Sequence, residues 1–300
     1  MAEKIHVRVP ASIGNMGSGF DCAGLSLKVY NEFTVSKSGR TEISFSKACL
    51  SVSSGMVLDL FTDAFKAGLK HSGRKAFPAA IEIRDRIPFK RGLGSSATVV
   101  LAGVISGFLF GGRKISKTEI LKLSLPFEGH IDNLAASLYG GFAIGGPAGS
   151  PIVASPAPER LRIIVFIPAE GLSTKSARDV LPKKVPFSDA VYNIAGYGML
   201  CSSFFIKDLN LLKIGLCDKL HQPYRGKLIP HLEGFLTREI SPHIIGACLS
   251  GAGPSVAFFA DFRNIKEAVC AVKKAVTDEK LSGDVRIFSP GGRTEWKIIE

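Results

Sequence analysis

A glycine-rich segment that leads into an uncharged apolar run constrains the fold of this 300-residue chain more than any other feature. The segment PFKRGLGSSAT occupies residues 88–98, and no charged residue lies between 92 and 112. Backbone N–H groups at the start of a helix bind anions, and glycine lets a phosphate approach the backbone closely. The pattern therefore predicts a phosphate-binding loop followed by a buried helix. The strictly apolar part, 99–112, contains Ser106 and is shorter than the ~20 residues of a membrane span.

The segment lacks features of the Walker A loop and of the Rossmann loop, and this limits the type of phosphate loop that it can form. It does not end in Gly-Lys-Ser or Gly-Lys-Thr, so it is not a Walker A loop. Its two glycines and Ala97 fit the Rossmann spacing G-x-G-x-x-A, but the stretch IPFKR (87–91) keeps them apart from the preceding predicted strand. Lys90 and Arg91 supply positive charge, and the hydroxyls of Ser95 and Ser96 can bind phosphate or Mg2+. A simple turn before a core helix is the structural alternative.

Charge and composition narrow the classes of partner. The chain has 38 Lys and Arg residues against 26 Asp and Glu, a net charge of +12. The basic residues form no run longer than two and do not alternate with aromatic residues, so we expect no nucleic-acid binding. An anionic substrate or nucleotide accounts for the charge equally well. The first ten residues lack the apolar region of a secretory signal, and the six cysteines form no C-x-x-C pair. We therefore expect a cytoplasmic protein with reduced thiols and no membrane association.

The order of the predicted elements favours an α+β fold, because strands and helices do not alternate strictly. A segment with four prolines and three glycines, 145–158, predicts a boundary between two domains, 1–155 and 156–300. Ser116 and Glu119 form a capping box that opens a short helix. Periodicity predicts strands at 4–10, 27–36, 41–46, 78–84, 161–167, 244–249, 255–260 and 284–288, and helices at 57–70, 99–112, 128–139, 188–206, 209–218, 225–237 and 264–278.

Two further glycine-rich loops and two arginines are candidates for binding. Asn15 and Asp21 lie in the first loop, and LSGAGPS (249–255) forms the second, although each loop could also be an ordinary turn. Arg178 and Arg225 each offer a two-pronged fork that suits a carboxylate. In the alternative interpretation each arginine is a surface charge.

The segment EGHIDN (128–133) places two carboxylates and an imidazole at a predicted helix start. Acidic residues at such a position often serve only as partners of the helix dipole. No second His or Cys completes a zinc site. Mg2+, however, needs only one or two carboxylates in addition to phosphate oxygens, and Glu128 could supply one.

Together these segments resemble the GHMP family of small-molecule kinases, and within it the homoserine kinases. PFKRGLGSSAT resembles the family's phosphate loop, and LSGAGPS resembles its C-terminal glycine motif. Homoserine kinase motifs are similar to RVPASIGNMGSGFDCAGLSL (8–27), EGHIDNLAASLYGGF (128–142), STKSARDVLP (173–182) and HQPYR (221–225). The matches occur in the family's order along the chain.

The resemblance implies a two-lobed fold, with an N-terminal lobe like ribosomal protein S5 domain 2 and a ferredoxin-like C-terminal lobe. It implies ATP-dependent phosphorylation of the side-chain hydroxyl of L-homoserine, in threonine biosynthesis, with Mg2+, by a homodimer. The residues around the ATP phosphates would be Pro88, Phe89, Lys90, Arg91, Gly92, Leu93, Gly94, Ser95, Ser96, Ala97 and Thr98. Those around homoserine would be Asn15, Asp21, His130, Asp132, Thr174, Arg178 and Arg225.

The resemblance also implies catalytic roles for Ser96, Glu128, Asn133 and Arg178. Ser96 and Glu128 would hold Mg2+, and Asn133 would orient the substrate hydroxyl, with no general base assigned. Two other functions remain open. One is phosphorylation of another small alcohol, such as mevalonate or shikimate, and the other is non-catalytic binding of a nucleotide or RNA. The acidic and amide groups with two arginines favour an amino acid zwitterion over another alcohol. A non-catalytic binding protein would not need the set of Ser96, Glu128 and Arg178.

Overall fold

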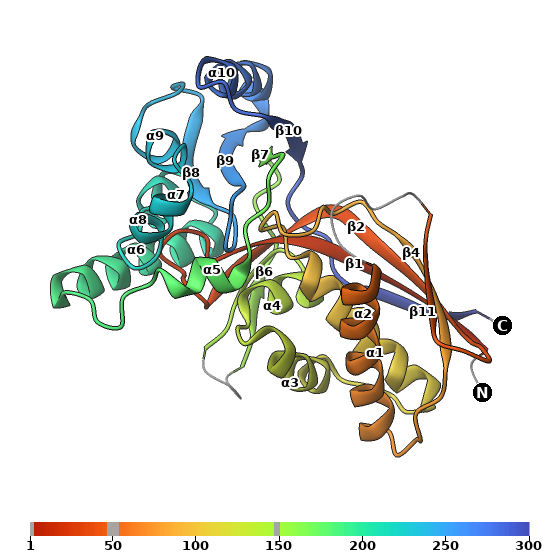
Figure 1. The fold of residues 1–300 in the computed structure, drawn as a ribbon. Coiled ribbons are helices and arrows are strands. Elements are labelled where there is room, and N and C mark those ends of the chain that lie inside the picture. Colours follow the sequence, from red (N-terminus) through yellow and green to blue (C-terminus); the bar gives the residue numbers. More distant parts are fainter. Residues whose placement is uncertain (1–2, 47–53, 147–150, 300) are drawn as a thin grey trace.

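The computed structural model describes residues 3–46, 54–146 and 151–299. In these residues the chain forms two lobes, each built from one β-sheet with helices packed on it (Figure 1). The expected two-lobed α+β fold is confirmed. Residues 147–150 of the predicted boundary segment, and Cys49, lie outside the described residues, and the other five cysteines are free thiols.

The N-terminal lobe contains a sheet in which β3 and β4 are parallel and the other described pairs are antiparallel. Its main strands, in spatial order, are β11 (Glu295–Ile299), β1 (Lys4–Gly14), β2 (Ala23–Lys37), β4 (Ala79–Arg84) and β3 (Glu42–Phe45). The short strands β5 (Phe142–Ile144) and β6 (Val153–Ser155) extend it beside the start of β2. Because β11 pairs with β1, the last strand returns to this sheet, close to the N-terminus (Figure 1). The domain division at residues 155 and 156 stays a prediction.

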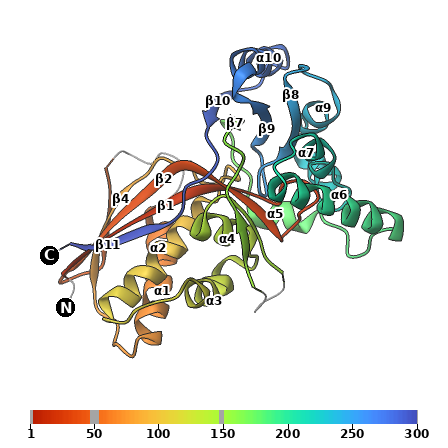
Figure 2. The same cartoon turned by 180° about the vertical axis from the view of Figure 1, so that it is seen from behind.

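Helices of the same lobe cover one face of this sheet (Figure 2). They are α1 (Ser54–His71), α2 (Ser95–Phe110), α3 (Lys117–Glu128) and α4 (Asp132–Tyr139). The uncharged apolar segment forms α2, which packs against both β1 and α1, with nearly all of its side chains buried. Its lack of charge follows, because almost no part of this helix reaches solvent. Among the described residues, no helix combines the length and apolar character needed to cross a membrane.

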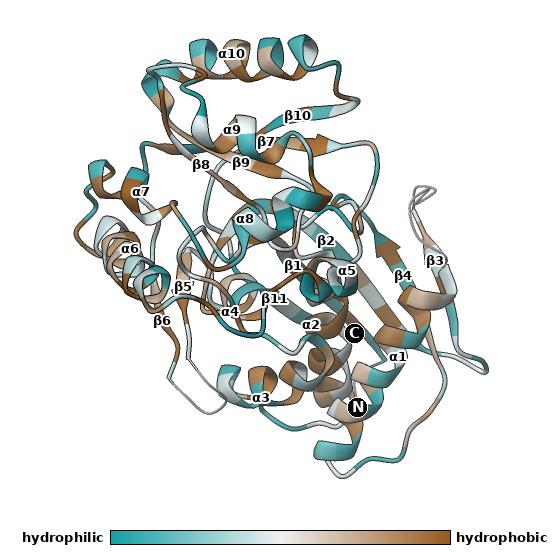
Figure 3. Ribbon diagram, turned by 60° about the vertical axis from the view of Figure 1, so that its left-hand side comes forward, coloured by the Kyte–Doolittle hydropathy of each residue, from teal (hydrophilic) through white to brown (hydrophobic). Residues whose placement is uncertain are grey.

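The C-terminal lobe contains an antiparallel sheet in the order β10 (Gly283–Phe288), β7 (Leu161–Pro168), β9 (Val256–Asp261) and β8 (Ile244–Leu249). In chain order, β7, a set of helices, β8, β9, α10 (Ile265–Asp278) and β10 follow the ferredoxin-like pattern. Strand β7 is buried on both faces, with Ile163 facing one apolar core and Ile164 the other. Helix α10 alternates between hydrophilic and hydrophobic residues, as one buried face requires (Figure 3).

The helices between β7 and β8 lie close to the junction of the lobes (Figure 1). They are α5 (Thr174–Asp179), α6 (Phe187–Phe205), α7 (Asn210–Gly215), α8 (Gln222–Arg225) and α9 (Leu232–Thr237), with a short 3-10 helix at Gly226–Leu228. A second 3-10 helix, Phe262–Asn264, follows β9. Phe204 of α6 stacks on Phe142 of β5 with ring centroids 4.1 Å apart. The two lobes therefore share an apolar core rather than meeting only at their surfaces.

A single residue interrupts each of two predicted helices. The helix predicted at 128–139 ends at Tyr139 as expected but begins only at Asp132, because Glu128 is the last residue of α3 and Gly129 adopts a left-handed conformation with φ of 77°. The helix predicted at 225–237 breaks between α8 and α9 at Pro230, which lacks an N–H and disfavours helical geometry in Ile229. The strands β5, β6 and β11 and the helix α5 were not predicted.

Hydrogen bonds between loops connect the two lobes at their junction. The hydroxyl of Ser250 donates to the carbonyl of Gly92 at 2.7 Å, and the N–H of Gly251 donates to the carbonyl of Gly14 at 3.1 Å. A Cβ atom on Gly92, whose φ is +74°, would lie 2.0 Å from the carbonyl oxygen of Ser250. The close approach of the phosphate loop to residues 250–254, the C-terminal glycine loop, therefore requires glycine at position 92.

Gly112 provides a matched control for Gly92, because it has the same φ of +74° but no atom within 4 Å of the place that a Cβ atom would take. We expect Gly112→Ala to lower the free energy of unfolding by about 1 kcal/mol through the left-handed backbone alone. Gly92→Ala should cost at least about 3 kcal/mol, because overpacking against Ser250 adds to that penalty. Urea denaturation of both variants measures the difference, and equal losses would contradict the close approach.

Candidate active site

A cleft at the junction of the lobes is lined by five loops from distant parts of the chain. It brings together Asn15, Asp21, Pro88, Phe89, Lys90, Gly92, Leu93, Gly94, Ser95, Ser96, Glu128, His130, Asp132, Asn133, Thr174, Arg178 and Arg225. All of these residues were predicted from the sequence as site residues. The remaining walls come from α1, from Leu172 and Ser173, and from residues 251–253.

Hydrogen bonds hold the phosphate loop in place, and the hydroxyls of its two serines have different partners. The side chain of Asn31 accepts from the N–H of Ile87 at 3.1 Å and donates to the hydroxyl of Thr98 at 3.1 Å. The hydroxyl of Ser95 is buried and donates to the carbonyl of Ile87. The hydroxyl of Ser96 instead donates to Oε1 of Glu128 at 2.5 Å. Gly94 precedes α2, so the first N–H groups of this helix, which lack partners within it, begin at the cleft.

Three residues of the predicted phosphate loop do not line the cleft. Ala97 and Thr98 are fully buried, because they belong to the first turn of α2 and face the core. The guanidinium of Arg91 donates to the carbonyls of Pro168 and Ala169, so it ties the loop to the end of β7. These three side chains therefore stabilise the shape of the loop and do not line the cleft.

A buried ion pair lies in the segment between α3 and α4. Nδ1 of His130 contacts Oδ1 of Asp132, and the other carboxylate oxygen accepts from the N–H of Asn15 at 3.0 Å. Burial lowers the pKa of His130, but the charge and hydrogen bond of Asp132, together with the charges of Glu128 and Asp21, outweigh burial and raise that pKa to about 9. The pKa of Asp132 is lowered despite complete burial, chiefly by His130. Burial raises the pKa of Glu128, and the hydrogen bond from Ser96 opposes the shift.

Asp21 and Arg178 face each other across the cleft and form a bidentate ion pair. Nη1 and Nη2 of Arg178 donate to the two carboxylate oxygens at 3.0 and 2.7 Å. Both side chains remain about one-third exposed, at 32% for Asp21 and 37% for Arg178. The pair is therefore open to a ligand that can replace either partner. Thr174 begins α5, one turn before Arg178, and lines the same wall.

Asn15 and Arg225 converge on the carbonyl of Gly251, one from each side. The amide of Asn15 donates to it at 2.8 Å, and Nη1 of Arg225 donates to it at 3.1 Å. Arg225 is only 1% exposed, and burial together with the nearby charge of Arg178 lowers its pKa to about 10. It therefore stays charged at neutral pH and brings a buried positive charge to the cleft.

Some residues that support or line the cleft were missed because no local pattern marks them. Asn31 lies within a strand, and its role depends on the distant residues 86, 87 and 98. Ser12 donates to Oδ1 of Asn133 at 2.9 Å and so orients this amide, another contact between distant segments. Gly251 was noted in a glycine-rich loop, and the structure makes its carbonyl a shared acceptor. Met56, Val57 and Leu60 line the cleft from α1. The spacing of Val57 and Leu60 indicated only a core face, and Met56 lies just before the predicted helix.

Comparison with known proteins identifies the family. Residues 59–141 match the family described as GHMP kinases N terminal domain, and residues 202–278 match GHMP kinases C terminal. The chain is 34% identical to the homoserine kinase of Aquifex aeolicus over 97% of its own length and 98% of that protein. The chain belongs to the GHMP kinase family. It is also 36% identical to the homoserine kinase of Caldicellulosiruptor bescii, over 89% of this chain and 90% of that protein.

Solved structures support the same fold for this GHMP kinase. The homoserine kinase from Cytophaga hutchinsonii superposes with a TM-score of 0.84 at 24% identity, covering 99% of this chain and 98% of that one. The mevalonate diphosphate decarboxylase from Enterococcus faecalis superposes with a TM-score of 0.71 at 15% identity, covering all of both chains. These two likenesses confirm the expected fold, and the family models and the relatives above confirm the expected membership of the family.

The donor groups of the cleft bear on metal binding. Among the residues that the structure describes, no cluster of three or more His, Cys, Asp or Glu side chains could hold a metal ion by itself. The hydroxyl of Ser96 and the carboxylate of Glu128, in contact with each other, are hard oxygen ligands of the kind that Mg2+ takes together with phosphate oxygens. This donor set fits an ion that arrives with a nucleotide rather than a resident metal.

The ion pair of His130 and Asp132 predicts a pH-dependent contribution to stability. Because the pKa of His130 is raised to about 9, this stabilisation is fully present below its ordinary value of 6.5 and is lost as pH rises through 9. Asp132→Asn should lower the free energy of unfolding by about 3 kcal/mol at pH 7, with a smaller loss at pH 10. Asp284→Asn, in an exposed pair with Arg286, should cost less than about 1 kcal/mol at both values. Urea denaturation tests this, and a loss for Asp132→Asn that is unchanged at pH 10 would contradict the ion pair.

Proposed function

We propose that this chain is a homoserine kinase, which transfers the γ-phosphoryl group of ATP to the side-chain hydroxyl of L-homoserine. The observation that carries the proposal is the exposed pair of Asp21 and Arg178 beside the phosphate loop. Near-complete coverage of homoserine kinase relatives at 34% identity supports the same reaction. In the cell it would serve threonine biosynthesis.

The charges of the cleft suit an amino acid zwitterion. A substrate ammonium can take the place of Arg178 on the carboxylate of Asp21, and a substrate carboxylate can take the place of Asp21 on Arg178. A zwitterion thus exchanges one ion pair for two and leaves no charge unpaired. An anionic alcohol such as mevalonate would leave the carboxylate of Asp21 without a partner, which carries a penalty in a partly desolvated cleft.

ATP fits the other end of the cleft. The N-terminus of α2 and Lys90 offer positive charge to its phosphates. Met56, Val57 and Leu60 provide an apolar wall that suits the adenine base. When bound with ATP, Mg2+ would neutralise charge on the phosphates, and Ser96 and Glu128 are the residues that would hold it.

The chemical step then depends on position more than on proton transfer to a dedicated base. The homoserine hydroxyl forms the new bond to the γ-phosphorus while the bond from that phosphorus to the bridging oxygen of the β-phosphate breaks. ADP leaves, and the hydroxyl proton passes to a phosphoryl oxygen. In the described cleft each carboxylate already has a partner, Asp21 with Arg178, Asp132 with His130, and Glu128 with Ser96. Asn133, held by Ser12, is placed to orient the attacking hydroxyl.

A panel of acceptors tests this function. We expect ADP release from Mg-ATP to be stimulated by L-homoserine and not by mevalonate or shikimate, because only the zwitterion satisfies both Asp21 and Arg178. 4-Hydroxybutanoate, which lacks the ammonium, and 3-aminopropan-1-ol, which lacks the carboxylate, should each lose about 100-fold or more in kcat/KM. Stimulation by mevalonate or shikimate alone would show that the enzyme is a kinase for a different small alcohol. ATP binding without turnover of any acceptor would favour a non-catalytic nucleotide-binding protein.

The proposed enzyme also has a surface that suits a homodimer. Phe187, Val191, Ile194, Gly198 and Phe205 lie on one stripe of α6, and the first three are 86%, 50% and 72% exposed. This stripe carries no charged side chain, and an apolar stripe of this kind packs well against a symmetry-related copy of itself. We therefore place the interface of the proposed dimer along α6.

Charge introduced on this stripe should separate the two copies. We expect the wild-type chain to sediment as a dimer at micromolar concentration and Ile194→Glu to sediment as a monomer, because the charge would be buried at the interface. Ile298→Glu, at a 50% exposed position on β11, is the control and should stay dimeric. A monomeric wild type, or a dimer unchanged by Ile194→Glu, would contradict this interface.

A further inference from the structure

Three hydrogen-bond acceptors fix the orientation of the Arg225 guanidinium, and they use only two of its three nitrogens. Nε donates to the carbonyl of Ala177 at 3.1 Å, and Nη1 donates to the carbonyl of Gly251 at 3.1 Å. The second hydrogen of Nη1 is directed to Nδ1 of His221 at 3.2 Å. Within the described part of the chain, Nη2 has no hydrogen-bond partner. Since Arg225 lines the cleft, this nitrogen is the one left for a ligand.

His221 is fully buried, and its contacts determine which ring nitrogen carries the proton. Nε2 lies 2.9 Å from the carbonyl oxygen of Gly17. A carbonyl can only accept, so Nε2 is protonated and Nδ1 is the acceptor for Arg225. Burial lowers the pKa of His221, which keeps the imidazole neutral and Nδ1 free to accept. The ring of Phe20 stacks on the imidazole at 5.1 Å and also lies 5.3 Å from the guanidinium carbon of Arg225.

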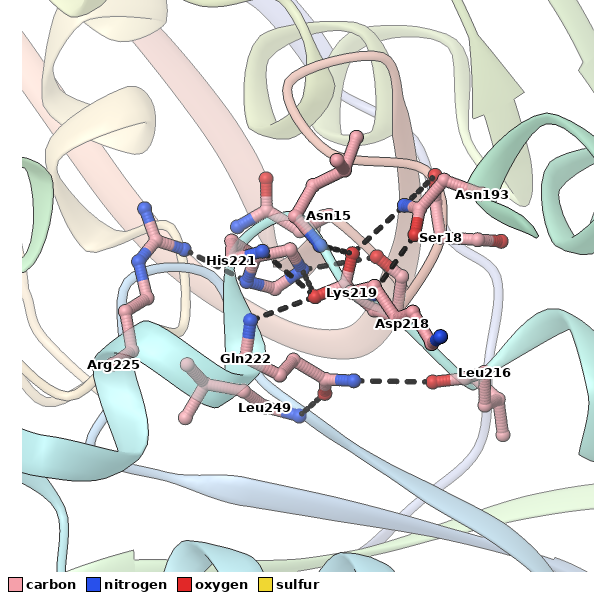
Figure 4. A network of polar contacts seen from close by, with 12 residues as sticks. Asn15, Ser18, Asn193, Leu216, Asp218, Lys219, His221, Gln222, Arg225 and Leu249 are labelled. Carbon is pink, nitrogen blue, oxygen red and sulfur yellow. Dashed lines mark hydrogen bonds and ion pairs between the residues drawn. The ribbon is translucent and has the colours of Figure 1, made fainter. Parts of the chain in front are cut away.

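Asp218 anchors the turn that carries His221 and Arg225 (Figure 4). Its side chain is buried, with four hydrogen bonds to the carboxylate. They come from the N–H groups of Leu220, His221 and Gln222 and from the amide of Asn193 on α6, at 2.7–2.9 Å. The side chain of Gln222 then joins the turn to β8 by accepting from the N–H of Leu249 at 2.7 Å. The turn is therefore held on two sides before any ligand binds.

The same imidazole touches both halves of the proposed substrate site. Through Gly17 it contacts the loop that carries Asn15 and Asp21, where the substrate ammonium is proposed to bind. Through Nδ1 it contacts Arg225, on the side proposed for the substrate carboxylate. A residue in this position can fix the separation of the two charged groups, which is what distinguishes one amino acid zwitterion from another.

We infer that His221, anchored by Asp218, is a positioning residue that aims the free Nη2 of Arg225 at the carboxylate of the substrate. The identity of the substrate in this inference rests on the proposed function. The orientation of Arg225 rests only on the contacts of His221. His221 itself touches no reacting group.

Two substitutions at position 221 separate its two contacts. The oxygen of an Asn side chain reaches the place of Nδ1, so His221→Asn keeps an acceptor for Arg225 and loses the contact to Gly17. The nitrogen of a Gln side chain reaches the place of Nε2, so His221→Gln keeps the donor to Gly17 and loses the acceptor. Each variant loses one buried hydrogen bond, so the pair controls for loss of stability.

We expect His221→Gln to raise the KM for homoserine about tenfold and to change the KM for ATP less than twofold. His221→Asn should keep the KM for homoserine within about threefold of the wild type. An equal rise for both variants, or a parallel rise in the KM for ATP, would show that His221 supports only the fold. An unchanged KM for homoserine in His221→Gln would also overturn the inference.

Nitrogen NMR of the protein with 15N-labelled histidine gives a readout that needs no turnover. The resonances of His221, assigned by their loss in His221→Gln, should report a neutral ring protonated at Nε2. Arg225→Leu should shift the Nδ1 resonance, because it removes the donor to that nitrogen. No shift would overturn the inference even if homoserine is the substrate. A shift in a protein that does not phosphorylate homoserine would leave the positioning of Arg225 standing and reject the proposed substrate.

Discussion

Backbone contact between three glycine-rich loops is the constraint on which the cleft depends. The phosphate loop meets the C-terminal glycine loop at Gly92 and Ser250, so closely that no side chain fits between them. The C-terminal glycine loop in turn meets the end of β1 through Gly251 and Gly14. These loops come from both lobes, so the wall that is proposed to face the ATP phosphates exists only when the lobes are docked. This dependence accounts for the location of the site at the junction of two sheets.

The electrostatics of the cleft follow from its partial burial. Asp21 is paired with Arg178 and Asp132 with His130, because an unpaired charge in such surroundings is costly. Arg225 differs from these residues, since two of its partners are carbonyl groups and the third is a neutral imidazole. It therefore keeps a positive charge that no neighbouring group neutralises directly. In the proposed function, a substrate carboxylate would supply the missing charge, and the open pair at Asp21 would accommodate an ammonium group.

Local sequence patterns predicted the helices and strands that bury one face or all of their side chains within a short stretch of sequence. The uncharged run became α2, the alternating residues at 4–10 became part of β1, and the capping box at Ser116 opens α3 as expected. Patterns failed where one residue interrupts a continuous periodicity, as Gly129 and Pro230 do. They also failed for β11, whose place in the first sheet depends on pairing with β1 at the opposite end of the chain, a contact that no local window contains.

The candidate site was predictable as a set of segments, but its connections were not. The motifs placed Asn15, Asp21, Glu128, Arg178 and Arg225 among the candidates, because their residue types are those that bind phosphate, metal and a zwitterion. Nothing in the sequence indicated that Asn31 would hold the phosphate loop or that His221 would orient Arg225. Their contacts join residues that share no sequence period.

The amino-acid sequence by itself determined the family, the reaction class and the chemical groups available, because motif residues carry those properties locally. Only the tertiary structure decided which of these groups are paired, which are buried and which still face the cleft. The physical reason is that hydrogen bonds and ion pairs depend on distance and direction in space. The packing of two sheets sets both, because it brings distant loops, such as those of Asn15 and Gly251, 236 positions apart, within hydrogen-bonding distance.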